Sequence, residues 1–169
     1  MTYAQARSTL RTGDIIAQTH RSWFRSWHDF KVMLIRLWGQ TEYAHVGLIW
    51  RSGGRVFVIE AVKPRVRIFP LSLIGDFYHI PMNRDLSMAA EDYAFRQIGE
   101  PYSEGLAVLT ALKLVDKGDY GVWHCAKLVN EILRENKFDF GLAFTPGEIV
   151  REALAAGKRL RHVENGGIK

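Results

Sequence analysis

A single thiol and six imidazoles are the side chains of this sequence that could carry out nucleophilic chemistry. The chain has one cysteine, Cys125. A thiolate attacks carbonyl carbon atoms when an imidazole takes its proton, and a third polar group improves the pair by fixing the tautomer of that imidazole. One cysteine forms no internal disulfide, and no Cys/His cluster has the spacing of a zinc site. The thiol is therefore either inert or a nucleophile, and we expect no metal or other cofactor.

Cys125 lies at the start of a segment with helical periodicity. Residues 125–136 place their apolar side chains on one face, as in an amphipathic helix. Unpaired backbone N–H groups and the helix dipole at this end favour a thiolate over a thiol. The same residue lies near the apolar face of the predicted helix, so a buried, inert cysteine remains an alternative.

The histidines differ in how well each could serve Cys125. His124 is adjacent in sequence, but neighbouring helical positions point about 100° apart. Three histidines lie in basic segments that we expect to be exposed: His20, His28 and His162. The two remaining candidates are His45 and His79.

A predicted hairpin brings Glu60 to His45. Strands at 45–50 and 55–62 flank Arg51–Gly54, a strong turn signal. A four-residue turn makes the numbers of paired residues sum to 105 and places His45 opposite Glu60, whereas a Gly53–Gly54 turn gives 107 and makes them diagonal neighbours on one face. Glu60 is the single charge in an apolar strand, which requires a partner. A purely structural buried pair stays the alternative to a catalytic one.

The remaining segments predict an α+β fold with an antiparallel sheet, or a small barrel, flanked by helices. The expected elements are a turn at 10–14 with a strand at 15–17, extended segments at 66–69 and 77–82, a helix at 87–98 stopped by Gly99, and a helix from the capping box at 145–148 to about 156. Residues 105–115 are ambiguous. A basic aromatic helix is predicted at Arg21–Trp38, where Trp23, Trp27, Phe30, Leu34 and Leu37 share a face that would contact either the core or a membrane surface.

Length and charge bound the kind of protein. With 169 residues, 47% of them hydrophobic and 24% charged, the chain is the size of one domain, 1–169, and is neither disordered nor fibrous. Residues 1–75 hold 11 Lys/Arg against 4 Asp/Glu, a net charge of +7, and residues 76–169 hold 12 against 14, a net charge of −2. The basic half favours anionic partners, although no nucleic-acid motif is present. Residues 1–11 lack an apolar signal core, so we expect cytoplasmic synthesis without a signal peptide.

Five sequence blocks in order resemble the circularly permuted papain-like NlpC superfamily, in its YiiX/YebB-like branch. They span residues 10–129 and read LRTGDII from Leu10, YAHVGLI from Tyr43, VIEA from Val58, GEPY from Gly99 and WHCAKLV from Trp123. The resemblance implies a permuted papain-like fold and a thiol hydrolase in which His45 and Glu60 precede the nucleophile, Cys125.

The same resemblance assigns roles and marks departures. Cys125 would be the nucleophile, His45 the general base and acid, and Glu60 the group that orients His45. Tyr102 or Tyr43 could lie beside the oxyanion, with the Cys125 backbone N–H as a donor, and the counterpart of Asp14 is structural. Three positions depart from the family pattern: Ala44, Ala126 and Lys127. Lys127 replaces an acid, which could help to hold a thiolate and favour an acidic substrate.

Three functions follow as expectations. The first is a cysteine peptidase or amidase that cleaves peptidoglycan peptides, delivered by lysis, a secretion system or a phage virion. The second is a thiol acyltransferase or hydrolase that acts on lipids, similar to lecithin:retinol acyltransferase, with residues 21–38 on the membrane. The third is a non-catalytic subunit of a larger assembly that uses the basic half of the chain for contact.

Overall fold

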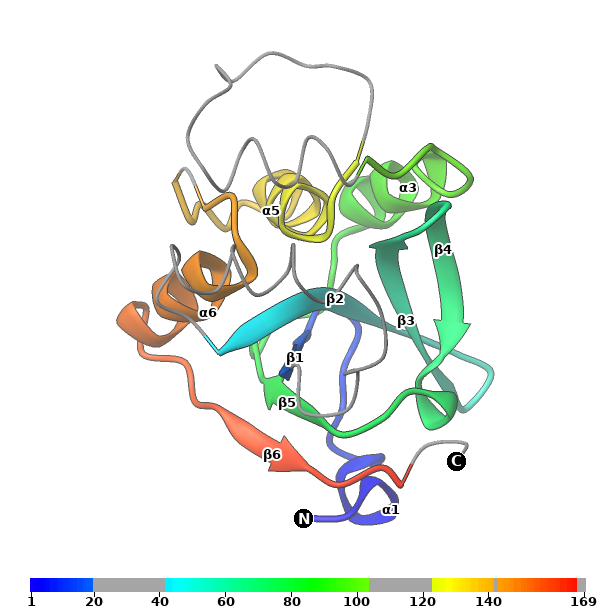
Figure 1. The fold of residues 1–169 in the computed structure, drawn as a ribbon, viewed down its shortest axis with the longest axis vertical. Coiled ribbons are helices and arrows are strands. Elements are labelled where there is room, and N and C mark those ends of the chain that lie inside the picture. Colours follow the sequence, from blue (N-terminus) through cyan, green and yellow to red (C-terminus); the bar gives the residue numbers. More distant parts are fainter. Residues whose placement is uncertain (20–41, 104–122, 142, 167–169) are drawn as a thin grey trace, which may run out of the picture.

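The computed structural model describes residues 1–19, 42–103, 123–141 and 143–166. These residues form a six-stranded antiparallel sheet in the order β4-β3-β2-β1-β5-β6 (Figure 1). The strands are β1 (Ile15–Thr19), β2 (Tyr43–Ser52), β3 (Arg55–Val62), β4 (Arg65–Pro70), β5 (Phe77–Ile80) and β6 (Arg161–Val163). The sheet is open, with β4 and β6 at its edges, so the expected α+β class is confirmed and the barrel alternative is not.

The β2–β3 hairpin has the shorter of the two expected turns. Ser52 pairs with Arg55 and Leu48 with Ile59, so the numbers of paired residues sum to 107. Gly53 and Gly54 have φ angles of 54° and 74°, the left-handed backbone that a two-residue hairpin turn requires and that glycine adopts without a steric cost. His45 and Glu60 are therefore diagonal neighbours across the continuation of this ladder.

Strand alternation divides the buried side chains between two cores on opposite faces of the sheet. On β1, Ile15 and Ala17 lie in the core that also holds Cys125, whereas Ile16 lies in the second core with Leu10. Both faces of the first part of β1 are therefore buried, which explains why this strand begins with three consecutive apolar residues.

Helices α3 (Met88–Arg96), α5 (Cys125–Glu135) and α6 (Pro146–Ala155) lie together on the side of the first core (Figure 1). The second face meets α1 (Tyr3–Ala6) and the 3₁₀ turn η1 (Leu71–Leu73). The capping box at Thr145 and Glu148 is confirmed. In the described segments no helix is long and apolar enough to cross a membrane.

The other elements expected within the described residues agree with the structure to within a few residues. The strand expected at 77–82 ends at Ile80, and α1, η1 and β6 are elements that the sequence patterns did not predict. The predicted helix at Arg21–Trp38 and the ambiguous segment 105–115 lie outside the described residues.

Candidate active site

Cys125 is the first residue of α5, and the residue before it caps the helix. The Nδ1 atom of His124 accepts a hydrogen bond from the Lys127 backbone N–H at 3.2 Å. His124 is buried, which lowers its pKa, and the charge of Lys127 adds to this, so that the value falls to about 4. The imidazole is therefore neutral at neutral pH and can act as an acceptor. His124 thus has a structural role that adjacency in sequence did not suggest.

His45 lies between the thiol and the acid, and its contact with Glu60 is the one that the hairpin arithmetic predicted. Its Nε2 lies 2.8 Å from Oε2 of Glu60, and its ring also hydrogen-bonds to Cys125. Because Nε2 faces Glu60, Nδ1 is the ring nitrogen left for the sulfur. The structure therefore brings together all three residues of the predicted triad, from α5, β2 and β3.

The charges in this group favour an ion pair between sulfur and imidazole. Burial raises the pKa of the Cys125 thiol, but His45 and the backbone N–H groups of Val46 and Ala126 outweigh burial and hold that pKa below its usual value. For His45, burial lowers the pKa, but Cys125 and Glu60 outweigh it and raise the value to about 10. Cys125 is 7% exposed and the His45 side chain 19% exposed, so the pair is partly open to solvent. These interactions favour the thiolate and the imidazolium over the two neutral forms.

Glu60 has a second charged partner, which the sequence analysis missed. Nε and Nη2 of Arg67, on β4, lie 2.8 Å and 2.7 Å from Oε1 of Glu60, while Oε2 faces His45. Burial raises the pKa of Glu60, but the hydrogen bonds and charges of His45 and then Arg67 outweigh it and lower the value. The sequence contains a signal for this contact, because a two-residue hairpin turn at 63–64 places Arg67 opposite Glu60.

Gly47 allows β2 and β3 to approach each other beside this pair. A Cβ at this position would lie 2.6 Å from Cγ2 of Val58 and 3.4 Å from Cβ of Glu60. Val58 is fully buried, so its methyl group has little room to move away. Gly47 thereby sets how closely β3 can carry Glu60 toward His45.

We expect Gly47→Ala to lower the free energy of unfolding by about 1–3 kcal/mol because β3 must shift. The same shift should slow alkylation of Cys125 at neutral pH, since it moves Glu60 relative to His45. Denaturant unfolding and iodoacetamide kinetics measure the two effects. Gly75→Ala is the matched control, because nothing lies within 4 Å of a Cβ built there. Equal unfolding energies for the two variants would contradict this reading.

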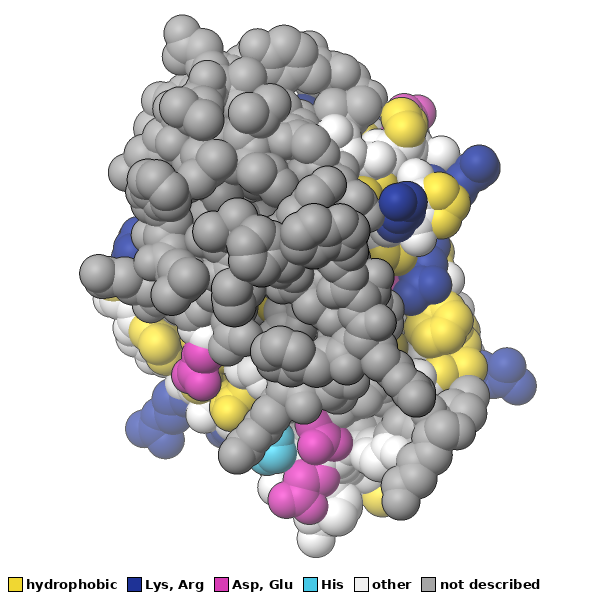
Figure 2. All heavy atoms as spheres, in the orientation of Figure 1, with side chains coloured by type: hydrophobic (Ala, Val, Ile, Leu, Met, Phe, Trp, Pro, Cys, Tyr) yellow, Lys and Arg dark blue, Asp and Glu magenta, His cyan; other side chains and the backbone are white. Residues whose placement is uncertain are grey.

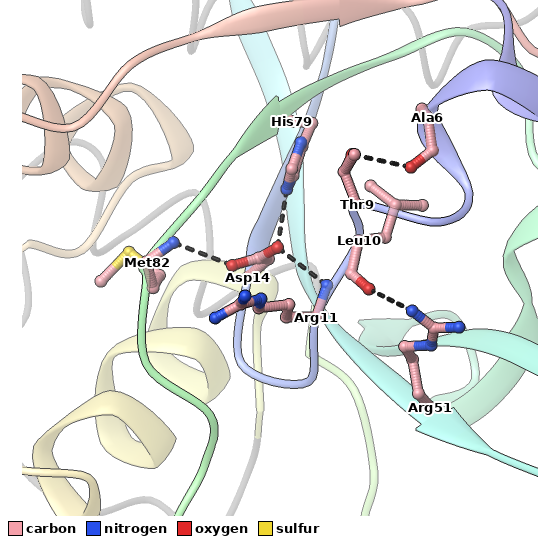
Figure 3. A network of polar contacts seen from close by, with 8 residues as sticks. All are labelled: Ala6, Thr9, Leu10, Arg11, Asp14, Arg51, His79 and Met82. Carbon is pink, nitrogen blue, oxygen red and sulfur yellow. Dashed lines mark hydrogen bonds and ion pairs between the residues drawn. The ribbon is translucent and has the colours of Figure 1, made fainter.

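A separate buried pair fixes the start of β1 (Figure 3). Oδ2 of Asp14 lies 2.7 Å from Nε2 of His79 and accepts from the Arg11 backbone N–H at 2.9 Å, while Oδ1 accepts from the Met82 N–H at 2.9 Å. Both side chains are 1% exposed. His79, the second candidate partner for Cys125, is therefore occupied by Asp14, in keeping with a structural role for that acid.

The residues proposed around the oxyanion lie close to the site in different ways. Tyr102 forms a parallel bridge with Trp123, two residues before the nucleophile. The β1–β2 ladder skips Ala44, so Tyr43 packs with Tyr78 against the core that contains Cys125. Burial, then the charge and hydrogen bond of Glu42, raise the pKa of Tyr43 to about 12, which keeps its hydroxyl protonated. Their contact with a substrate stays a prediction.

Lys127 extends toward an aromatic ring. Its Nζ lies 4.8 Å from the centroid of the Trp123 ring. The groups that lower the pKa of Cys125 are His45 and the Val46 and Ala126 backbone, whereas the charge of Lys127 acts on His124. Direct support of the thiolate by Lys127 remains a prediction.

Fold and site together define an α+β protein with a hydrogen-bonded Cys–His–Glu group at the start of a helix. The chain is similar to the crystal structure of the metalloprotein yiiX from Escherichia coli O157:H7 (DUF1105), with a TM-score of 0.58 and 22% sequence identity over 78% of this chain and 69% of that one. No protein-family model and no curated protein matches the chain. The likeness to yiiX supports the YiiX-like part of the resemblance at the level of the fold, and membership of the papain-like NlpC superfamily stays a prediction.

The yiiX protein is described as a metalloprotein. Within residues 1–19, 42–103, 123–141 and 143–166, no three His, Cys, Asp or Glu side chains are grouped so that they could hold a metal ion. Glu60 and Asp14 each face a histidine, and Glu60 also faces Arg67, a cation that would repel a metal ion. The described residues therefore offer no such group of donors.

Proposed function

We propose that this protein is a cysteine-dependent amide hydrolase that acts on peptidoglycan peptides. The observation that carries the proposal is the position of His45, which hydrogen-bonds to both Cys125 and Glu60. A buried structural pair would need only Glu60 and His45. The added contact to the chain's single thiol, at a helix start, is the arrangement that nucleophilic catalysis requires.

The reaction follows from the protonation states. The Cys125 sulfur attacks the amide carbonyl carbon, and its electron pair forms the C–S bond while the carbonyl oxygen becomes an oxyanion. The Cys125 backbone N–H, at the first position of α5, is the donor we assign to that oxyanion. The C–N bond then breaks as the His45 imidazolium protonates the leaving amine.

Release of the acyl group uses the same histidine. Neutral His45 now takes a proton from water, and the hydroxyl group attacks the thioester carbonyl. The C–S bond breaks, the product leaves as a carboxylic acid, and the proton held by His45 restores the original ion pair with the Cys125 sulfur. Glu60 supports the imidazolium in both halves of the cycle through Nε2.

The choice of peptidoglycan rests on the family resemblance and on the net charge of +7 in residues 1–75, which suits an anionic cell wall. Delivery by lysis, a secretion system or a phage virion belongs to the same proposal. The alternative function, a thiol enzyme that acts on lipids, depends on residues 21–38, which lie outside the described residues. No observation on the described residues favours it.

The test is incubation with purified peptidoglycan fragments and, in parallel, with ester phospholipid vesicles. We expect new amine and carboxyl ends in the stem or bridge peptides, and a mass increase on Cys125 that matches an acyl thioester. Cys125→Ala should lose both signals, since no other thiol exists in the chain. Cleavage of lipid alone would replace the peptidoglycan substrate, and product formation by Cys125→Ala would reject the thiol mechanism.

A further inference from the structure

The acid of the proposed triad is held from both sides. In the β3–β4 ladder Glu60 is directly opposite Arg67. Two guanidinium nitrogens, Nε and Nη2, lie within 2.8 Å of Oε1, and the other carboxylate oxygen lies 2.8 Å from His45. A carboxylate with one free oxygen can rotate about its terminal bond, whereas one held at both oxygens keeps its plane.

Arg67 itself is fixed from a second direction. Its Cζ lies 4.3 Å from the centroid of the Phe69 ring, a cation–π contact on the same strand. The Arg67 side chain is 44% exposed, whereas Glu60 is 3% exposed. The guanidinium therefore connects a buried carboxylate to the solvent-facing side of β4.

We propose that Arg67 is a positioning residue that orients the Glu60 carboxylate toward His45 and keeps it charged. The proposal rests on the proposed function and extends it: four groups then form a chain of contacts from sulfur to guanidinium, one each from α5, β2, β3 and β4. Arg67 does not touch the reacting atoms, and it acts through Glu60.

The charges around Glu60 determine what removal of Arg67 would do. His45 faces it from β2, Arg67 faces it from β4, and Cys125 on α5 acts through His45. Without Arg67 the buried carboxylate loses one of two charged partners, so its pKa rises. As the pH falls, Glu60 would then be protonated earlier, and His45 would lose its anionic partner at a higher pH than in the wild type.

The neighbouring strand position supplies a matched control. Figure 2 shows several Lys and Arg side chains on the side of the molecule where Figure 1 labels α3, β3 and β4, so other cations lie near Arg67. Arg65 is exposed, lies two residues before Arg67 on the same face of β4, and pairs with Val62 rather than with an acid. Arg65→Met therefore removes the same charge from the same strand without touching Glu60.

The experiment is the pH dependence of Cys125 alkylation by iodoacetamide, which needs no substrate. In Arg67→Met we expect the acid limb of the profile to move up by about one pH unit or more, and in Arg65→Met to stay in place. Arg67→Lys keeps the charge with a single nitrogen, so its shift should be smaller. It also serves as the second variant if Arg67→Met does not fold.

A double variant shows whether Arg67 acts through Glu60. In a Glu60→Gln background there is no carboxylate to orient or to keep charged, so adding Arg67→Met should change the profile no further. An additive effect, or equal profiles for Arg67→Met and Arg65→Met, would overturn the proposal. If instead the wild-type thiol has the profile of a free cysteine, the proposed function fails first.

Discussion

Replacing His45 with alanine is expected to slow the alkylation of Cys125 strongly at low pH. In the wild type His45 lowers the pKa of the Cys125 thiol, and the pKa of the His45 imidazole is raised to about 10, so we expect the thiol to react as a thiolate below the free-thiol pKa of about 8.5. In His45→Ala the Cys125 thiol is still buried but the thiolate has lost its counterion, so the pKa of the thiol rises. We expect alkylation near pH 6 to slow by about tenfold or more, and hydrolysis to fall by about 10²–10⁴-fold.

The measurement is the alkylation rate across pH, with intact mass to confirm one label on the single cysteine. His162→Ala is the matched control, because His162 is exposed on β6 and its ring packs on Tyr78 at a centroid distance of 5.0 Å, away from the triad contacts. Its profile should match the wild type. Superimposable profiles for His45→Ala and the wild type would rule out an activated pair.

Among the substitutions proposed for this protein, Asp14→Ala should cause the largest decrease in the free energy of unfolding. The carboxylate accepts from two backbone N–H groups and faces His79, and the contacts with His79 and with the Met82 N–H are buried. Alanine leaves the two buried groups without an acceptor, which costs about 3–5 kcal/mol in the free energy of unfolding. Denaturant unfolding measures this loss. Asp14→Asn keeps an acceptor and should lose less.

Asp76→Ala is the comparison for this prediction. Asp76 is exposed, and its carboxylate also accepts a backbone N–H, from Asn165 at 2.8 Å. Water can replace that contact, so the expected loss is about 1 kcal/mol or less. If Asp14→Ala unfolds at the same denaturant concentration as Asp76→Ala, burial of the Asp14 network is not what stabilises β1.

The predictable parts of the fold were those fixed by local rules. The glycine turn at 53–54 limited the β2–β3 register to two possibilities, both of which kept His45 beside Glu60. The capping box at Thr145 and the amphipathic pattern after Cys125 located α6 and α5 for similar local reasons. Short-range turn and capping geometry depends on few residues and is therefore visible in the sequence.

The missed parts depend on contacts between distant segments. Asp14 meets His79 only because β5 pairs with β1 in the sheet, and nothing near either residue specifies that pairing. The three-residue strand β6 is similarly defined by its partner β5. Arg67 is a different case. A two-residue hairpin turn at 63–64 predicts that Arg67 pairs with Glu60, just as the preceding turn predicts that His45 lies near Glu60.

The sulfur, the imidazole, the carboxylate and the guanidinium come from four separate elements. In the unfolded chain these groups are no longer in contact, so His45 no longer activates the thiol. The one cysteine would then behave as an ordinary thiol in water. The alkylation rate of Cys125 therefore reports the fraction of folded protein, without an added fluorophore or a second cysteine.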